Sequence, residues 1–162
     1  MALANAGGDI ENAIKQAPKF GITEGGQALA GLPTTITDVN ILGLKVAHGL
    51  VVTTSFYLDL DDKTREWSKC FMERNGGKVP NMLQAGAYGA GAVLHYLKAI
   101  RAAGTDEAKA AVAQMKKMPI EDSYTHGATV REDGRVIRDM YVMQTKTPEE
   151  RDASTATTNS CP

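Results

Sequence analysis

The chain has 162 residues, 43% of them hydrophobic, with 18 basic and 19 acidic side chains and a formal net charge of −1. This length suits one ordinary domain with a hydrophobic core, whereas two full domains would be cramped. A near-neutral charge without a basic stripe argues against nucleic acid and anionic membrane as partners. No apolar run approaches the roughly 18 to 20 residues of a membrane span, and the N-terminus lacks the pattern of a signal peptide.

The first residues predict the end of a strand followed by a helix. Residues 2–5 are short for a whole strand, because strands usually have about five or six residues. The turn at residues 6–9 leads into a helix that Asp9 can cap. Pro18 should end or kink that helix, since proline lacks the backbone N–H that a helix interior needs.

Two further strands and a short helix follow. Residues 27–31 form a short apolar run that ends in Leu32-Pro33-Thr34-Thr35, and Thr37 or Asp38 can cap the next helix. Residues 49–56 are rich in β-branched side chains, which is typical of a strand buried on both faces. This alternation of strands and helices predicts right-handed crossovers and a parallel sheet.

Three strand ends should therefore meet at one edge of the sheet, at residues 5–7, 32–35 and 53–57. In α/β proteins, ligands bind at the carboxyl ends of parallel strands. The Gly7-Gly8 turn before a helix is either an anion site or a simple tight turn. A cleft with hydroxyl and aromatic groups but no acid/base pair describes a receptor better than a catalyst.

The pattern of the second half of the sequence predicts three helices. Asp61 or Asp62 can cap the first, a long one should run over residues 83–103, and Thr105 can cap the third. Their apolar positions recur at helical spacing.

A hairpin should follow the helices. Residues 128–131 and 135–138 flank Asp133-Gly134, a strong signal for a tight turn. Residues 140–144 should prolong the second strand after a bulge, and residues 149–162 lack the apolar side chains that would order them. The predicted fold class is α/β, with a short parallel sheet and crossover helices, then a three-helix segment and a C-terminal β-hairpin.

Catalytic and metal-binding patterns do not stand out in the sequence. His48, His95 and His126 are scattered without a partner at ligand spacing, and Ser55 lacks the glycines of a nucleophile elbow. The acidic run at residues 59–62 lacks the mid-loop glycine and distal glutamate of an EF-hand. We therefore expect no enzyme, no cofactor and no metal site.

The two cysteines, Cys70 and Cys161, have no metal-binding or redox spacing. Either they stay separate, on a helix face and in the tail, or they form a disulfide, which would imply an oxidising compartment.

Several segments together match a known family. Residues 3–9, 12–17 and 20–22 resemble the substrate-binding proteins of branched-chain amino-acid ABC transporters, a group of periplasmic type I binding proteins. Residues 47–53 and 127–135 continue the resemblance, which runs collinearly from about residue 2 to 148.

The resemblance implies a fold of two α/β lobes, joined by three crossover strands, that close on a small solute in the cleft between them. Residues 1–56 would form part of the second lobe, and residues 57–118 the hinge and helices of the first lobe. Residues 119–148 would be the C-terminal hairpin of the second lobe, followed by a disordered tail at 149–162. The chain would then be a C-terminal fragment with a partial type I periplasmic-binding-protein fold.

The resemblance also implies a binding site. Its predicted ligand-binding residues are Asn5, Ala6, Gly7, Leu32, Pro33, Thr34, Thr35, Phe56, Tyr57, Met82 and Gln84. Amino-acid binders of this family often place a carboxylate in the loop after the second strand, and residues 32–35 contain none. An unpaired ammonium group in a closed cleft would be costly. We therefore expect a small organic or aromatic acid ahead of an amino acid.

The implied function is that of the extracytoplasmic, periplasmic substrate-binding component of an ABC transporter, with the permease subunits as partners. A fragment raises an alternative. Helices within residues 59–118 would lose the sheet that they cover, and such exposed apolar surface is unstable in a monomer. The alternative is a self-associating sensory or interaction domain, a homo-oligomer without its own solute.

Overall fold

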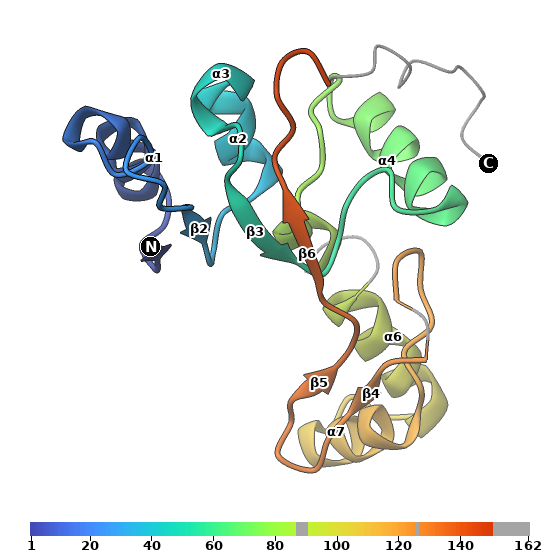
Figure 1. The fold of residues 1–162 in the computed structure, drawn as a ribbon. Coiled ribbons are helices and arrows are strands. Elements are labelled where there is room, and N and C mark those ends of the chain that lie inside the picture. The colour runs from blue at the N-terminus through green and yellow to red at the C-terminus, as the bar shows by residue number, and fades with distance from the viewer. Residues whose placement is uncertain (87–90, 126, 151–162) are drawn as a thin grey trace. The chain divides into compact units, whose positions relative to one another are not determined.

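The computed structural model describes residues 1–86, 91–125 and 127–150, which belong to two compact units (Figure 1). Unit 1 comprises Met1–Thr54 and the segment that begins at Tyr141, and unit 2 comprises Ser55–Met140. The predicted α/β class, with a short parallel sheet, is confirmed. The assignment of residues 1–56, 57–118 and 119–148 to lobes stays a prediction.

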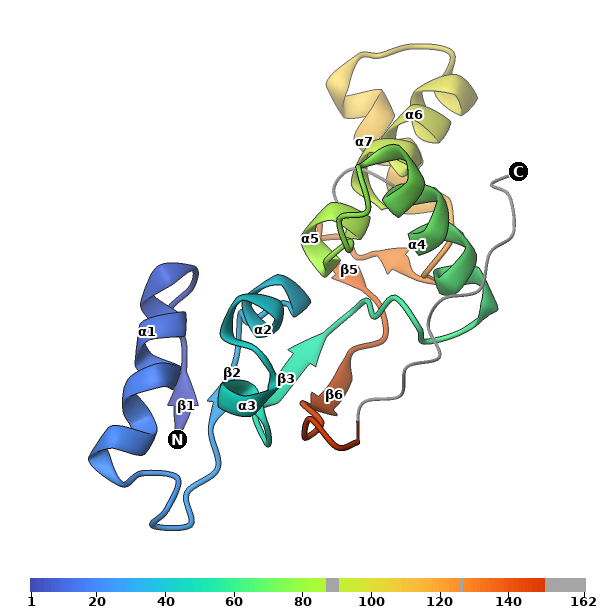
Figure 2. The same cartoon turned by 90° about the horizontal axis from the view of Figure 1, so that it is seen from above.

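Unit 1 is built on a four-stranded sheet in the order β1-β2-β3-β6. Its strands β1 (Ala2–Leu3), β2 (Ala30–Gly31) and β3 (Val51–Thr54) are parallel. Figure 2 shows these three arrows pointing one way and β6 (Tyr141–Gln144) pointing the other. The expected parallel alignment of these three strands is thus confirmed.

The prediction that residues 140–144 prolong the hairpin is wrong. Instead β6 is an antiparallel partner of β3, with Thr54 opposite Tyr141 and Val51 opposite Gln144. The physical reason is that a strand pattern specifies a pleated segment but not its partner.

The helices of unit 1 are α1 (Gly8–Gln16), the 3₁₀ helix η1 (Ala17–Phe20), α2 (Ile36–Leu42) and α3 (Leu44–Ala47). As predicted, α1 stops just before Pro18. The predicted cap at Asp9 is wrong, because Gly7 is the N-cap and no side chain caps it. The predicted caps Thr37 and Asp38 are wrong as well, because Thr35 is the N-cap of α2.

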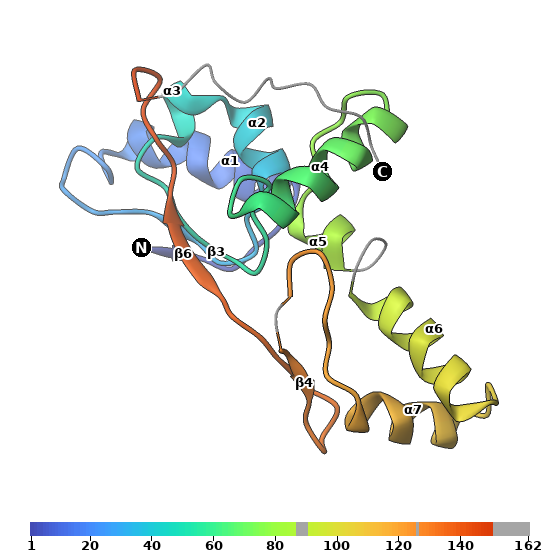
Figure 3. The same cartoon turned by 90° about the vertical axis from the view of Figure 1, so that its right-hand side faces the viewer.

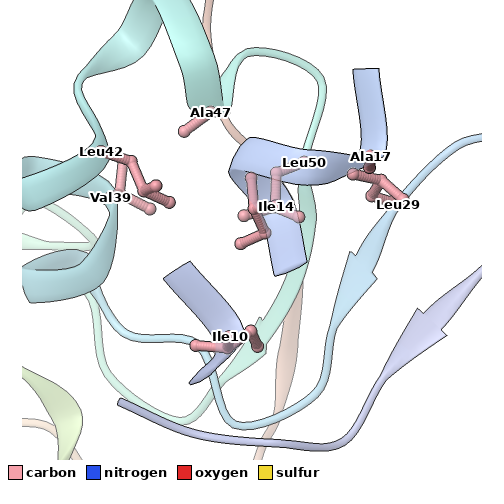
Figure 4. Packing of buried hydrophobic residues seen from close by; sticks show 8 residues of the cluster. All are labelled: Ile10, Ile14, Ala17, Leu29, Val39, Leu42, Ala47 and Leu50. Carbon is pink, nitrogen blue, oxygen red and sulfur yellow. The ribbon is translucent and has the colours of Figure 1, made fainter. Parts of the chain in front are cut away.

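The core of unit 1 lies between its helices and the parallel strands (Figure 4). Ile10 and Ile14 share one face of α1 because they are four residues apart. The full cluster is Ile10, Ile14, Ala17, Leu29, Val39, Leu42, Ala47 and Leu50. Burying a Leu or Ile side chain stabilises a fold by roughly 1.5–3 kcal/mol, so this cluster fixes α1 to α3 on the sheet.

Unit 2 contains mostly helices and one small hairpin. Figure 3 shows α6 (Ala92–Ala103) leading into α7 (Ala108–Lys117). The other helices are α4 (Asp62–Arg74) and the short α5 (Met82–Gln84). The hairpin of β4 (Thr129–Val130) and β5 (Val136–Ile137) is confirmed, with Gly134 at φ 88° in its turn.

Two helix boundaries in unit 2 differ from the prediction. The single helix over residues 83–103 is wrong, because α6 begins only after Gly91, whose ψ of −97° is not helical. Glycine disfavours a helix interior, which is consistent with an interruption at this glycine-rich stretch. Thr105 is not the cap of α7 either. Glu107 is the N-cap of α7, and its carboxylate accepts hydrogen bonds from the backbone N–H groups of Lys109 and Ala110.

Some predictions fall outside the described residues, namely those for residues 87–90, for His126 and for the tail beyond Glu150. Cys161 is also outside them, whereas Cys70 is half-buried on α4 and is not a free thiol.

Candidate functional site

Two of the predicted site segments follow neighbouring strands of unit 1. Leu3 lies opposite Gly31 in the sheet, and Leu32 N donates to Leu3 O at 3.0 Å. Residues 5–7 and 32–35 therefore leave the same edge side by side. The side chain of Leu32 is 50% exposed, and Asn5, Ala6 and Gly7 are exposed as well.

The turn at Gly7 exposes the start of α1. Gly7 has φ 60°, a conformation that favours glycine, and its carbonyl accepts from Glu11 N at 3.2 Å. The first backbone N–H groups of a helix have no partner within the helix, so a polar solute could accept from them. Asp9 and Glu11 lie in this first turn and stabilise the helix through its dipole. The same two carboxylates weaken the turn as an anion site.

The two threonines of the second segment serve unit 1 itself. Thr34 is only 1% exposed, and its Oγ1 has no hydrogen-bond partner among the described residues. Thr35 forms a capping box for α2, in which its N and Oγ1 donate to Asp38 Oδ2 at 2.7 and 2.9 Å. Leu32 is exposed, and Pro33 and Thr35 are half-exposed. Because the Thr35 hydroxyl is engaged by Asp38, Leu32 and Pro33 are the members of this loop that are open to a solute.

In unit 2, Phe56 is a core residue. It is 4% exposed and makes edge-to-face contacts with Trp67 and Tyr124, with ring centroids 5.5 and 5.6 Å apart. The neighbouring Tyr57 is half-buried, and burial, with a smaller effect of the Asp59 charge, raises the pKa of its hydroxyl. Tyr57 therefore stays a protonated hydrogen-bond donor at neutral pH.

Met82 and Gln84 lie on the short helix α5. Met82 is half-buried against the cluster of Phe56, Ala85 and Tyr124. Gln84 Oε1 accepts from Asn81 N at 3.0 Å, which closes a capping box at the start of α5. The oxygen of Gln84 is therefore engaged in holding α5 in place.

Sequence reasoning missed two features. Arg138 donates to Tyr124 Oη and stacks on the Tyr124 ring, with its guanidinium carbon 5.0 Å from the ring centroid. No spacing rule links two residues so far apart on a loop and a strand end. The second feature is a pocket in unit 1 that lies at the other edge of the sheet, before β2 and β3 rather than after them.

Two kinds of site are absent from the described residues, 1–86, 91–125 and 127–150. No group of three or more His, Cys, Asp or Glu side chains in these ranges could hold a metal ion. None of the helices described there has the length and apolar character to cross a bilayer.

Comparison with known proteins gives a match to the periplasmic binding protein family over residues 1–153. A periplasmic binding protein from Burkholderia mallei is 44% identical, with a TM-score of 0.86 over 95% of this chain and 40% of that one. A branched chain amino acid ABC transporter periplasmic ligand-binding protein from Burkholderia xenovorans is 36% identical, with a TM-score of 0.80 over the same shares, 95% and 40%. No protein with curated annotation matches significantly.

A more distant structure shares the fold. A solute binding protein of an ABC transporter from Rhodopseudomonas palustris, in complex with 3,4-dihydroxy benzoic acid, is 19% identical with a TM-score of 0.72. That match covers 89% of this chain and 40% of the other. The present chain thus spans 40% of the length of each of these three relatives.

Proposed function

Because this chain belongs to the periplasmic binding protein family, we propose that it is part of the periplasmic substrate-binding component of an ABC transporter. Its solute is a small organic acid, aromatic acids included, or an amino acid. Its macromolecular partners are the permease subunits of that transporter.

The observation that carries the proposal is the exposed carboxyl edge of β1 and β2. Two segments, residues 5–7 and 32–33, leave adjacent parallel strands there with their side chains uncovered. This is the position at which open α/β sheets bind ligands. We take Leu32 as an apolar contact for the solute and the amides at the start of α1 as polar ones.

The acidic side chains near this edge decide between the solute classes. Residues 32–35 contain no carboxylate, and Asp38 is engaged in capping α2, so a solute ammonium group has no acidic partner in this loop. Asp9 and Glu11 on α1 are the acidic groups that would favour an amino acid instead. We rank an aromatic acid first and use leucine as the comparison ligand. The relative at 19% identity holds 3,4-dihydroxy benzoic acid, and the relative at 36% identity is named for branched chain amino acids, so both solute classes enter the test.

Titration calorimetry of this chain with 4-hydroxybenzoate and with leucine tests the proposal. We expect saturable binding of 4-hydroxybenzoate, and about tenfold weaker binding by Leu32→Ala, equivalent to about 1.4 kcal/mol. Ile41→Ala is the matched control, because Ile41 is an equally apolar and exposed side chain of unit 1 on α2. Tighter binding of leucine, or equal losses in both variants, would contradict the proposal.

A second candidate function, self-association, is favoured by the exposed face of α6. Val93, Tyr96 and Leu97 are 49%, 40% and 49% exposed at helical spacing. The side of α6 that is buried carries His95 and Ala99, with His95 Nε2 at 3.0 Å from Met115 O of α7. These three side chains therefore form an uncovered apolar stripe on α6, and such stripes mark interaction surfaces.

Size-exclusion chromatography with light scattering tests this second function. We expect the chain to self-associate and Leu97→Glu to make it monomeric, because a charge in an apolar contact is costly. Arg101→Glu changes the charge at another exposed position of α6 and should leave the assembly intact. A wild-type chain that stays monomeric at high concentration would rule the second function out, and it would leave the calorimetric test of the first unaffected.

A further inference from the structure

Unit 1 contains a pocket of about 220 Å³ at the sheet edge opposite the proposed solute site. Residues 27–29, directly before β2, and residues 48–50, directly before β3, form two of its walls. Ile14, Pro18, Thr23 and Val46 complete the lining. The pocket thus lies at the amino ends of the same strands whose carboxyl ends were proposed to hold the solute.

The floor of the pocket is apolar, and Thr23, Gln27 and His48 add polar groups to its lining. Ile14, Leu29 and Leu50 belong to the core of unit 1 and are nearly fully buried. An apolar cavity of about 150 Å³ can hold one benzene molecule, whereas drug-sized ligands need about 300 Å³ or more. The volume therefore fits a single ring.

The mouth of the pocket carries a hydrogen-bond acceptor. His48 Nδ1 lies 3.0 Å from Lys45 O. A carbonyl oxygen can only accept, so Nδ1 carries the proton in this contact. In the neutral imidazole the other nitrogen, Nε2, is then an acceptor. His48 is an exposed residue of the lining, so a ligand that brings an O–H or N–H donor can reach it.

We propose that this pocket binds a small uncharged aromatic molecule with one hydrogen-bond donor, of the phenol or indole class. The ring packs on Ile14, Leu29 and Leu50, and the donor is received by His48 Nε2. This site is separate from the solute site and goes beyond the proposed transport function.

The test is a ¹H–¹⁵N NMR titration of this chain with phenol at neutral pH. We expect saturable shifts of the amides of residues 27–29 and 48–50, and roughly threefold to tenfold weaker binding of toluene, which lacks the donor. His48→Phe should reduce the affinity for phenol to the affinity for toluene, and it should leave the affinity for toluene unchanged. Ala28→Leu should abolish the binding of both phenol and toluene, because the longer side chain fills the pocket.

Three outcomes would overturn the inference: shifts that do not saturate or lie elsewhere, equal affinity for phenol and toluene, or full phenol affinity in His48→Phe. Thermal melting of Ala28→Leu checks its fold, which should be retained because Ala28 is exposed. Leu32→Ala, at the other edge, should not alter phenol binding. Leu32→Ala should weaken the binding of 4-hydroxybenzoate alone, and Ala28→Leu should abolish the binding of phenol. Failure of one proposal is therefore distinguishable from failure of the other.

Discussion

The hydroxyl of Thr34 is enclosed by unit 1 rather than offered to a solute. Its side chain packs on Gly31, where an added Cβ would lie 2.0 Å from Thr34 Oγ1. Gly31 is therefore required because a threonine side chain occupies the space beside it. From the sequence alone, Leu32, Pro33, Thr34 and Thr35 were equivalent, because a loop has no periodicity that tells inward from outward side chains.

Replacement of Thr34 by valine should not weaken the fold or the proposed site. Valine keeps the shape and removes a buried hydroxyl without a partner among the described residues. We expect the free energy of unfolding to stay the same or to rise by up to about 1–3 kcal/mol. Urea denaturation measures this change. In the control Thr35→Val, the free energy of unfolding should instead fall by about 1 kcal/mol, because this change removes the cap of α2.

Binding of 4-hydroxybenzoate to the Thr34→Val variant supplies the complementary result. Unchanged affinity agrees with an enclosed hydroxyl. A loss of affinity at unchanged stability would show that Thr34 reaches the solute.

Phe56 shows another limit of sequence reasoning. Its position at the end of a strand predicted a residue of the binding site, and in the structure its ring packs between Trp67 and Tyr124. These partners lie far along the chain, so no local pattern reveals them. The assignment of Phe56 to the solute site stays a prediction, and its burial makes it the aromatic core of unit 2.

At the level of elements, local chemistry predicted the strands and the hairpin well. The β-branched run before Thr54 and the Asp133-Gly134 turn each fix a backbone conformation without distant partners. The pairing of β6 with β3 depends on long-range packing and was not predictable. The start of α6 was missed because its helical spacing continues through glycines that favour other conformations.

The start of α7 leads to a prediction about pH. Hydrogen bonds from Ala110 N and Lys109 N hold the pKa of Glu107 below its ordinary value of 4.5. A carboxyl group whose pKa is lower in the folded state stabilises that state above the unfolded pKa. This contribution is lost as the pH falls through the folded pKa. The cap should therefore be intact at neutral pH and lost in acid.

Thermal unfolding of Glu107→Gln against the wild-type chain measures this contribution. We expect the variant to be less stable at neutral pH, and the difference to shrink as the pH falls below 4.5. Asp106→Asn is the matched control, because it removes the neighbouring charge without removing the cap. A difference that stays constant down to strongly acidic pH would contradict the assigned role of Glu107.

For the whole molecule, the family was recognisable from sequence because its motifs recur in order along the chain, and the match over residues 1–153 agrees. The two proposed functions rest on different units, with the β1 and β2 edge in unit 1 and the α6 stripe in unit 2. The order of strands and helices predicted the first surface, and the second was expected only from the resemblance to a two-lobed family. They could not predict which side chains each unit leaves exposed, since that depends on how the described helices pack.

We propose above all that this chain binds a small organic acid at the carboxyl ends of β1 and β2. The most direct test is a ¹H–¹⁵N NMR titration of the chain with 4-hydroxybenzoate. We expect saturable shifts of the amides of residues 5–8 and of Leu32. The absence of any saturable shift, or shifts confined to the pocket residues 27–29 and 48–50, would contradict it.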